Sequence, residues 1–213
     1  LSNLLEFQRN LDPERRVTVP RPHPELSTRT VLTMQFFKGR PIRKLTPKSP
    51  EAQAVVNEIV HAALKQVLVD GVFHGDPHAG NLLCAEDGTL CMIDLGMVGR
   101  ITPEQRDDIV TLAVATIAND GTTVARVLLK MGTPTQRVNL SELKADIERI
   151  RSQHLMVTNF GEYDSAGFIE DFSKAAGKHR VKLARDMAIL GKAAATLEDI
   201  IRTLHPEVDL VGI

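Results

Sequence analysis

His74-Gly75-Asp76-Pro77-His78-Ala79-Gly80-Asn81 is the stretch that decides how this 213-residue chain is interpreted, together with the later run Ile93-Asp94-Leu95-Gly96. Asp76 lies five positions before Asn81, and Asp94 lies thirteen positions after it. Glycine and proline interrupt the first run, which predicts a polar loop rather than a helix or a strand. Two oxygen-bearing side chains thus come from a loop, and a third follows the next pair of predicted strands.

The segments around this loop have clear local patterns. Ser49-Pro50-Glu51 predicts the start of a helix, with an N-cap and a proline at the first helical position. Its apolar stripe ends at Asp70-Gly71, where glycine suits the left-handed residue that closes a helix. Beyond the loop, Leu82–Cys84 and Leu90–Ile93 are predicted strands, and Glu86-Asp87-Gly88 between them is a hairpin-turn signal.

The three side chains have the chemistry that phosphoryl transfer needs. Protein kinases show the same order: a catalytic-loop aspartate, an asparagine five residues on, and an Asp-Phe-Gly motif after two strands. Because Mg²⁺ prefers hard oxygen ligands, we predict that Asn81 and Asp94 bind the metal. Asp76 is then the predicted catalytic residue, which orients the attacking hydroxyl or water and accepts its proton. Turn-capping is the ordinary role of Asp76 and Asn81 in a loop, but the combined spacing and order favour the catalytic interpretation.

The two histidines of the loop allow a second interpretation. His74 and His78 are four residues apart, as in helical zinc sites, but Gly75 and Pro77 between them argue against a shared helical face. We expect His74 to brace the loop. His78 stands two residues after Asp76, where protein kinases often have a lysine that reaches the transferring phosphate, and it is predicted to be catalytic. This departure argues against ordinary protein phosphorylation.

The two runs resemble the UbiB (AarF/ADCK-type) family of atypical kinases. Asp-Pro-His-Pro-Gly-Asn and Asp-Phe-Gly-Met-Val-Gly are typical there, and this chain has Ala79 in place of the second proline and Leu95 in place of the phenylalanine. The resemblance implies ATP and Mg²⁺ as cofactors, and either phosphoryl transfer or ATP hydrolysis. It also implies a link to ubiquinone and isoprenoid-lipid metabolism, with a prenyl-quinone or lipid precursor as a partner and peripheral association with a membrane.

The resemblance also assigns an adenine site. Residues 30–37 are rich in β-branched and aromatic side chains, which predicts a strand. By the resemblance, this strand would be the hinge between the two kinase lobes. The residues assigned to the nucleotide are Met34 as gatekeeper, Gln35, Phe36 and Phe37 as the hinge, and Leu83 as the floor under the base. A plain core strand is the alternative for all of them.

The predicted fold is mainly α (α+β), a kinase-like C-lobe of bundled helices with a small catalytic-loop hairpin. Residues 1–40 would be a remnant of the N-lobe with the hinge, and residues 41–213 the C-lobe, with a linker containing three prolines over Arg40–Pro50. Helices are predicted from a capping box at Thr102–Gln105, over 122–131, after Asn139, and along a seam from Leu183 to Leu204, whereas 160–167 is a predicted loop. The phosphate-gripping lysine of the family should precede Leu1, so we expect this chain alone to bind ATP weakly.

Composition sets limits on the class of protein. The net charge of −1 provides no field that would attract nucleic acid, which we do not expect as a partner. Cys84 and Cys91 are expected to be buried small residues in a reducing compartment. No apolar run reaches the roughly 18 residues of a transmembrane helix, so the predicted location is cytoplasmic or peripheral to the inner membrane.

Two other functions fit part of the pattern. Small-molecule phosphotransferases of the aminoglycoside or choline kinase type also use a His-x-Asp-x-His-x-x-Asn loop, but Met97-Val98-Gly99-Arg100 favours the UbiB family. A catalytically silent binding scaffold is the other alternative, especially for an isolated fragment. Retention of Asp76, Asn81 and Asp94 argues against it for the intact protein.

Overall fold

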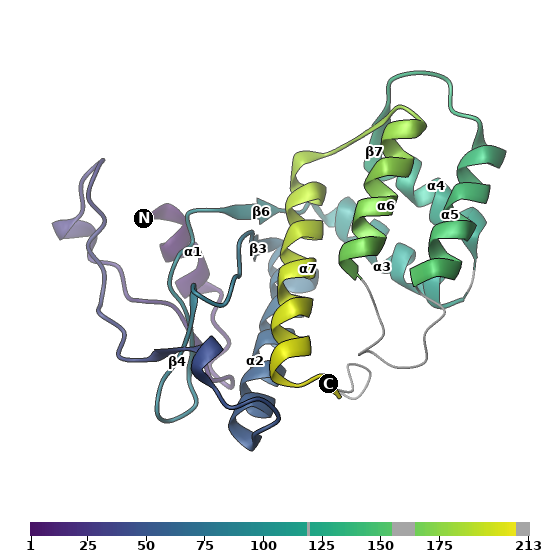
Figure 1. Ribbon diagram of the computed structural model, residues 1–213. Coiled ribbons are helices and arrows are strands. Elements are labelled where there is room, and N and C mark those ends of the chain that lie inside the picture. Colours follow the sequence, from purple (N-terminus) through teal and green to yellow (C-terminus); the bar gives the residue numbers. More distant parts are fainter. Residues whose placement is uncertain (119, 155–164, 208–213) are drawn as a thin grey trace. The chain divides into compact units, whose positions relative to one another are not determined.

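A computed structural model describes residues 1–118, 120–154 and 165–207, and its chain divides into two compact units (Figure 1). Unit 1 comprises Leu1–Val98 and Thr196–Ile213, and unit 2 comprises Gly99–Ala195. These boundaries differ from the predicted division at residue 40, which concerns kinase lobes and stays a prediction. The mixture of helices and short strands agrees with the predicted α+β class.

Unit 1 holds the loop and the hairpin. Its helical elements are α1 (Ser2–Arg9), η1 (Pro24–Leu26), η2 (Ile42–Lys44), α2 (Pro50–Lys65) and η3 (Gln66–Asp70). Its strands are β1 (Val17–Thr18), β2 (Arg40–Pro41), β3 (Val72–His74), β4 (Leu82–Cys84) and β5 (Leu90–Met92). Two elements cross the boundary in the sequence: β6 (Val98–Arg100) and α7 (Arg185–Leu204).

The predicted helix before the loop is confirmed, with one addition. The Ser49 side chain accepts a hydrogen bond from Ala52 N, Pro50 occupies the first turn, and Gly71 closes the helix at φ 68° and ψ 12°. The α-helix, however, ends at Lys65 and continues as the π-helical segment η3. A π turn adds one residue per turn and therefore changes which side chains face the core.

The predicted hairpin is also confirmed. Strands β4 and β5 pair antiparallel with Leu83 opposite Cys91, and they form the centre of a four-stranded sheet of order β1-β5-β4-β2. Gly88 in the connecting turn has φ +85°, a left-handed conformation that glycine adopts without strain. Cys84 and Cys91 are buried and free, as expected for small core residues.

The strand predicted over 30–37 is wrong. These residues, all described by the structure, form only an isolated bridge between Pro22 and Met34, with a hydrogen bond from Gln35 N to the Arg21 carbonyl on one side of it. Strand propensity reflects packing against neighbours, and no such packing covers Leu32 or Phe36, which are 46% and 89% exposed.

The linker predicted after residue 40 is not a free connection either. Ile42 and Leu45 are 0% and 3% exposed, and β2 pairs with β4 through Arg40 and Pro41. Burial of two large apolar side chains fixes this segment to the sheet that carries the hairpin.

Unit 2 contains α3 (Pro103–Ile117), α4 (Gly121–Met131), α5 (Leu140–His154), α6 (Ser165–Lys178) and a hairpin of β7 (Gly132–Pro134) and β8 (Val181–Leu183). The capping box is confirmed, since Thr102 and Gln105 exchange side-chain and backbone hydrogen bonds. Asn139 caps α5 as predicted. Of the predicted 160–167 loop, residues 160–164 lie outside the described part, and Ser165 onward belongs to α6, which was not predicted.

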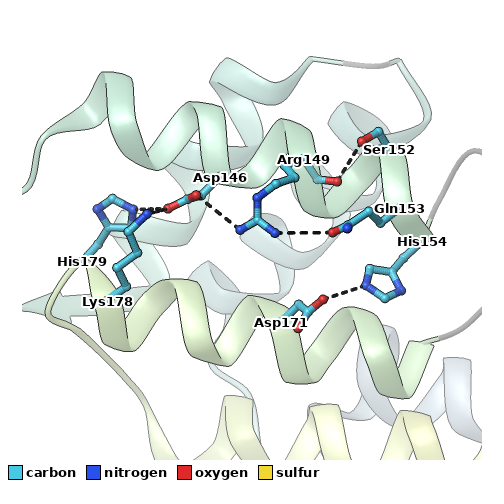
Figure 2. Close-up of polar contacts among 8 residues, drawn as sticks. All are labelled: Asp146, Arg149, Ser152, Gln153, His154, Asp171, Lys178 and His179. Carbon is cyan, nitrogen blue, oxygen red and sulfur yellow. Dashed lines mark hydrogen bonds and ion pairs between the residues drawn. The ribbon is translucent and has the colours of Figure 1, made fainter.

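Polar side chains join α5 to α6, as Figure 2 shows. The Asp146 carboxylate accepts from Lys178 Nζ at 2.6 Å, from His179 Nε2 at 2.8 Å and from Arg149 Nη2 at 3.3 Å. These are charge-assisted contacts on a carboxylate whose residue is only 8% exposed, and they hold the end of α6 on α5.

The final helix differs from its predicted seam. Leu183 belongs to β8 rather than to the helix, and Ala194 is exposed. Within unit 1 the buried residues of α7 are Glu198, Ile200, Ile201 and Leu204. Of the predicted seam, Met187, Ile201 and Leu204 are buried, whereas Leu190 and Leu197 are only half-buried.

Candidate functional site

The loop after β3 folds through its own hydrogen bonds. His78 N donates to the Asp76 carbonyl at 2.9 Å, and Asn81 N donates to the His78 carbonyl at 2.8 Å. The Asn81 side chain, 9% exposed, donates from Nδ2 to the Asp76 carbonyl at 3.2 Å. Because the amide nitrogen is used in this way, the Asn81 Oδ1 oxygen is the atom oriented to accept a ligand.

The β4–β5 hairpin returns the chain to this loop. Ile93 N donates to the Asn81 carbonyl at 3.0 Å, so Asp94 follows directly beside the loop. Asp94 is exposed, and its Oδ1 accepts from Gly96 N at 2.9 Å. A Cβ on Gly96 would lie 3.0 Å from that oxygen, which explains why the smallest residue suits this position. The structure therefore brings Asp76, Asn81 and Asp94 to one end of the hairpin.

His74 is buried at the base of the loop, with only 4% of its surface exposed. Its Nδ1 accepts a hydrogen bond from Asp76 N at 3.2 Å. Burial lowers the pKa of His74 to about 4, and the charges of Asp76 and Asp94 offset this only in part. The ring is therefore neutral at pH 7 and carries its proton on Nε2, which suits a brace rather than a proton donor.

His78 has the opposite environment. Its side chain is 51% exposed, and Nε2 lies 4.0 Å from Asp76 Oδ2. Nδ1 accepts from Gly80 N at 3.1 Å, which orients the ring, and a Cβ on Gly80 would lie 2.9 Å from it. The imidazole is thus exposed to solvent beside the Asp76 carboxylate.

The residues predicted to bind adenine are less closely assembled. Met34 and Phe36 are 39% and 89% exposed, and Gln35 is exposed as well. Phe37 approaches β4, since a Cβ on Gly39 would lie 2.7 Å from the Phe37 ring and 3.1 Å from the Cys84 carbonyl.

Leu83 lies on β4 itself and is half-buried between Pro41 and Cys91 in the sheet register. The structure thus places Leu83 and Phe37 near the hairpin and leaves the other three on the surface. Their roles toward a nucleotide stay predictions.

Two residues contact the site that the sequence patterns did not single out. Asn3 in α1 donates from Nδ2 to the Leu95 carbonyl at 2.8 Å, which fixes the backbone just after Asp94. Gln66 in η3 donates and accepts within the core below the loop. A glutamine three residues after Ala63, in line with an apolar stripe, was the available signal for the second.

No group of three or more His, Cys, Asp or Glu side chains within the described residues could hold a metal ion. The donor set that the loop and hairpin offer is one carboxylate, Asp94, and one amide oxygen, Asn81. That set fits Mg²⁺, which proteins often bind through one or two side chains together with substrate phosphates.

A recess open to solvent also lies in unit 1. Phe7, Arg15, His61 and Lys65 are among its lining residues, and none of the predicted site residues lines it. Gln66 and Met92, which lie beneath the loop and the hairpin, are also among its lining residues.

The fold is similar to that of a solved structure. The chain superimposes on the solved structure of Rv3197 from Mycobacterium tuberculosis in complex with erythromycin with a TM-score of 0.61. The two chains are 18% identical, and the match covers 95% of this chain and 52% of the other. At that identity the likeness concerns the fold alone.

Residues 2–128 match the model of the ABC1 atypical kinase-like domain, and the chain belongs to this family. The resemblance to AarF-type kinases is thereby confirmed. An uncharacterized Synechocystis protein is 28% identical over 88% of the chain, and the Arabidopsis thaliana protein ACTIVITY OF BC1 COMPLEX KINASE 1, chloroplastic, is 24% identical over 96% of it.

The chain spans 47% of the first of these relatives and 30% of the second. Family membership supports a kinase-like enzyme. None of the described helices is long and apolar enough to cross a bilayer.

Proposed function

We propose that this chain carries the catalytic loop and the metal-binding residues of an ATP- and Mg²⁺-dependent phosphoryl-transfer or ATP-hydrolysis site of the UbiB type. One observation carries the proposal: the Asn81 side chain and backbone tie the Asp76 carbonyl to Ile93, immediately before Asp94. Family membership supports it, since phosphoryl transfer depends mainly on positioning and electrostatic stabilisation.

Each residue has a role in this proposal. Asp94 would offer the metal its carboxylate while Gly96 N holds Oδ1 in place, and Asn81 would add Oδ1 without a further negative charge. Bound Mg²⁺ would supply charge neutralisation between the phosphates. Asp76 would orient the attacking hydroxyl or water and accept its proton.

His78 would act in place of the lysine of protein kinases. Its Nε2, 4.0 Å from Asp76 Oδ2, would reach toward the transferring phosphoryl group. The adenine would contact Leu83, which lies on β4. Met34 and residues 35–37 would form the rest of the adenine site.

The acceptor belongs to the same proposal. The resemblance to UbiB proteins suggests a prenyl-quinone or other isoprenoid-lipid precursor, a role in ubiquinone metabolism, and peripheral association with a membrane. The relatives' printed names support kinase chemistry only, so the acceptor rests on the resemblance.

Binding of Mg²⁺-ATP to the Asp94→Asn variant tests the proposal. Loss of the carboxylate should weaken Mg²⁺-dependent ATP binding by about tenfold or more, equivalent to about 1.4 kcal/mol. Glu86→Gln removes the same charge at the exposed far end of the hairpin and should bind like the wild type. Equal affinities for wild type, Asp94→Asn and Glu86→Gln, measured by titration calorimetry, would refute the metal assignment.

A further inference from the structure

The helix that leads to the loop changes its geometry at one residue. α2 is α-helical to Lys65, and the π-helical segment η3 begins at Gln66 and ends at Asp70 before the left-handed Gly71. The Lys65 ammonium group holds the segment from outside, since it donates to Asp70 Oδ1 and to the Asn10 carbonyl, each at 2.7 Å. Single-turn π segments are frequently found at functional sites.

Gln66 is the side chain that this segment directs inward. It is 9% exposed, and its Oε1 accepts a hydrogen bond from His74 N at 3.0 Å. Its Nε2 donates to Met92 Sδ, a weak acceptor, at 3.4 Å. One buried amide thus contacts β3 with its oxygen and β5 with its nitrogen.

These two hydrogen bonds connect Gln66 to both parts of the candidate site: the loop with Asp76 and the end of the hairpin with Asp94. His74 accepts from Asp76 N through Nδ1, so the strand residue that Gln66 holds also fixes the start of the catalytic loop. Met92 is the last residue of β5 and stands two positions before Asp94. A displacement of Gln66 would therefore act on the predicted base and on the predicted metal ligand together.

We propose that Gln66 is a positioning residue of this site, which sets the separation of Asp76 and Asp94 through His74 and Met92. The inference rests on the proposed function for its catalytic meaning. The geometric part, that Gln66 maintains the hydrogen bond from Asp76 N to His74, does not depend on that function. An ordinary core amide would stabilise unit 1 without a specific effect on the loop.

Gln66→Leu tests the role, because it keeps similar bulk but leaves the buried His74 N–H without its acceptor. We expect turnover of Mg²⁺-ATP to fall by tenfold or more, and the NMR signals of the Asp76 amide and the His74 ring to shift. Val55→Ala is the matched control: it removes buried apolar atoms from α2, where Val55 is 1% exposed, without touching the loop. At equal loss of unfolding free energy, Val55→Ala should leave turnover within about twofold and the two NMR signals unchanged.

Gln66→Glu is the conservative variant, since it keeps an oxygen acceptor for His74 N. It should recover most of the turnover and restore the Asp76 and His74 signals. If the leucine variant does not fold, Gln66→Met, which also lacks the acceptor, takes its place in the comparison with Val55→Ala. Equal behaviour of Gln66→Leu and Val55→Ala would overturn the inference. So would failure of Gln66→Glu to restore the signals.

Failure of the proposed function gives a different pattern. The wild type would then neither bind nor hydrolyse Mg²⁺-ATP, while the NMR shifts in Gln66→Leu would still report whether Gln66 holds His74 and the loop. The two proposals can therefore fail separately.

Discussion

Unit 1 has a neutral network, in which the amide of Gln66 and the ring of His74 hold the loop through hydrogen bonds. Unit 2 has a charged network, in which the Asp146 carboxylate accepts hydrogen bonds from Lys178 and His179 (Figure 2). The first network brings no charge of its own to a place where phosphates and a metal would meet. The second balances opposite charges where two helices meet. The contrast suggests that the first network is built for geometry and the second for stability.

The largest expected effect comes from the loop. Asp76→Asn keeps the size and the backbone contacts of the residue but removes the predicted proton acceptor, so turnover should fall by about 10² to 10⁴. Mg²⁺-ATP affinity should change little, because Asp76 is not a predicted metal ligand. Steady-state ATPase or phosphoryl-transfer rates measure the effect, and a loss of affinity with unchanged turnover would assign Asp76 to binding instead.

The next effect is the pH dependence of stability that His74 in the neutral network should cause. The pKa of His74 is lowered to about 4 by burial, so its contribution to stability is complete above its unfolded pKa of about 6.5 and is lost as the pH falls toward 4. The integrated loss is up to about 3 kcal/mol for a shift of this size. Urea unfolding of wild type and His74→Gln between pH 7 and 4 should show a steeper decline for the wild type; parallel curves would contradict this assignment.

The charged network around Asp146 should lose its contribution to stability at a lower pH than His74 does. Hydrogen bonding from Lys178, then from His179, holds the pKa of Asp146 well below its usual range. Its contribution is therefore complete above an unfolded pKa of about 3.9 and is lost only as the pH falls below it.

Asp146→Ala should destabilise the protein by about 2 kcal/mol near pH 7, since it removes charge-assisted hydrogen bonds to partly exposed partners. Chemical denaturation at pH 7 measures this, with Mg²⁺-ATP binding as the control that should stay unchanged. A loss of nucleotide affinity at equal stability would show that the two networks are coupled.

The smallest effect is expected next to the metal ligand. Gly96→Ala would put a Cβ 3.0 Å from Asp94 Oδ1, and the carboxylate would have to move by a few tenths of an ångström. Because Gly96 has no positive φ in the structure, backbone strain should not contribute. Mg²⁺-ATP affinity should fall by about two- to fivefold, under 1 kcal/mol; an effect as large as that of Asp94→Asn would mean that Gly96 has a further role.

Local sequence patterns predicted the elements around the site well. The Ser49 cap, the left-handed Gly71 and the Gly88 turn depend on neighbouring residues only, and all three are found. These cap and turn signals lie within a few residues of each other, so no tertiary information was needed for them. The roles of Asp76, Asn81 and Asp94, which rest on spacing and order over 19 residues, stay predictions.

Features that depend on distant packing were not predictable. The 30–37 segment has strand-forming residues but lacks a covering sheet among the described residues, so its propensity is not realised. The π-helical turn at Gln66 pairs its side chain with Met92, 26 residues away, and no local pattern encodes that contact. The helix α6 was missed because its sequence carries glycines and few large apolar residues.

A crystal structure of the protein with Mg²⁺ and a non-hydrolysable ATP analogue would test the central claim most directly. We expect a metal ion bound by the Asp94 carboxylate and the Asn81 Oδ1 oxygen at about 2.0–2.1 Å, with the terminal phosphate facing Asp76. A metal–nucleotide complex bound away from the end of the β4–β5 hairpin, or held there without Asp94 and Asn81, would contradict it.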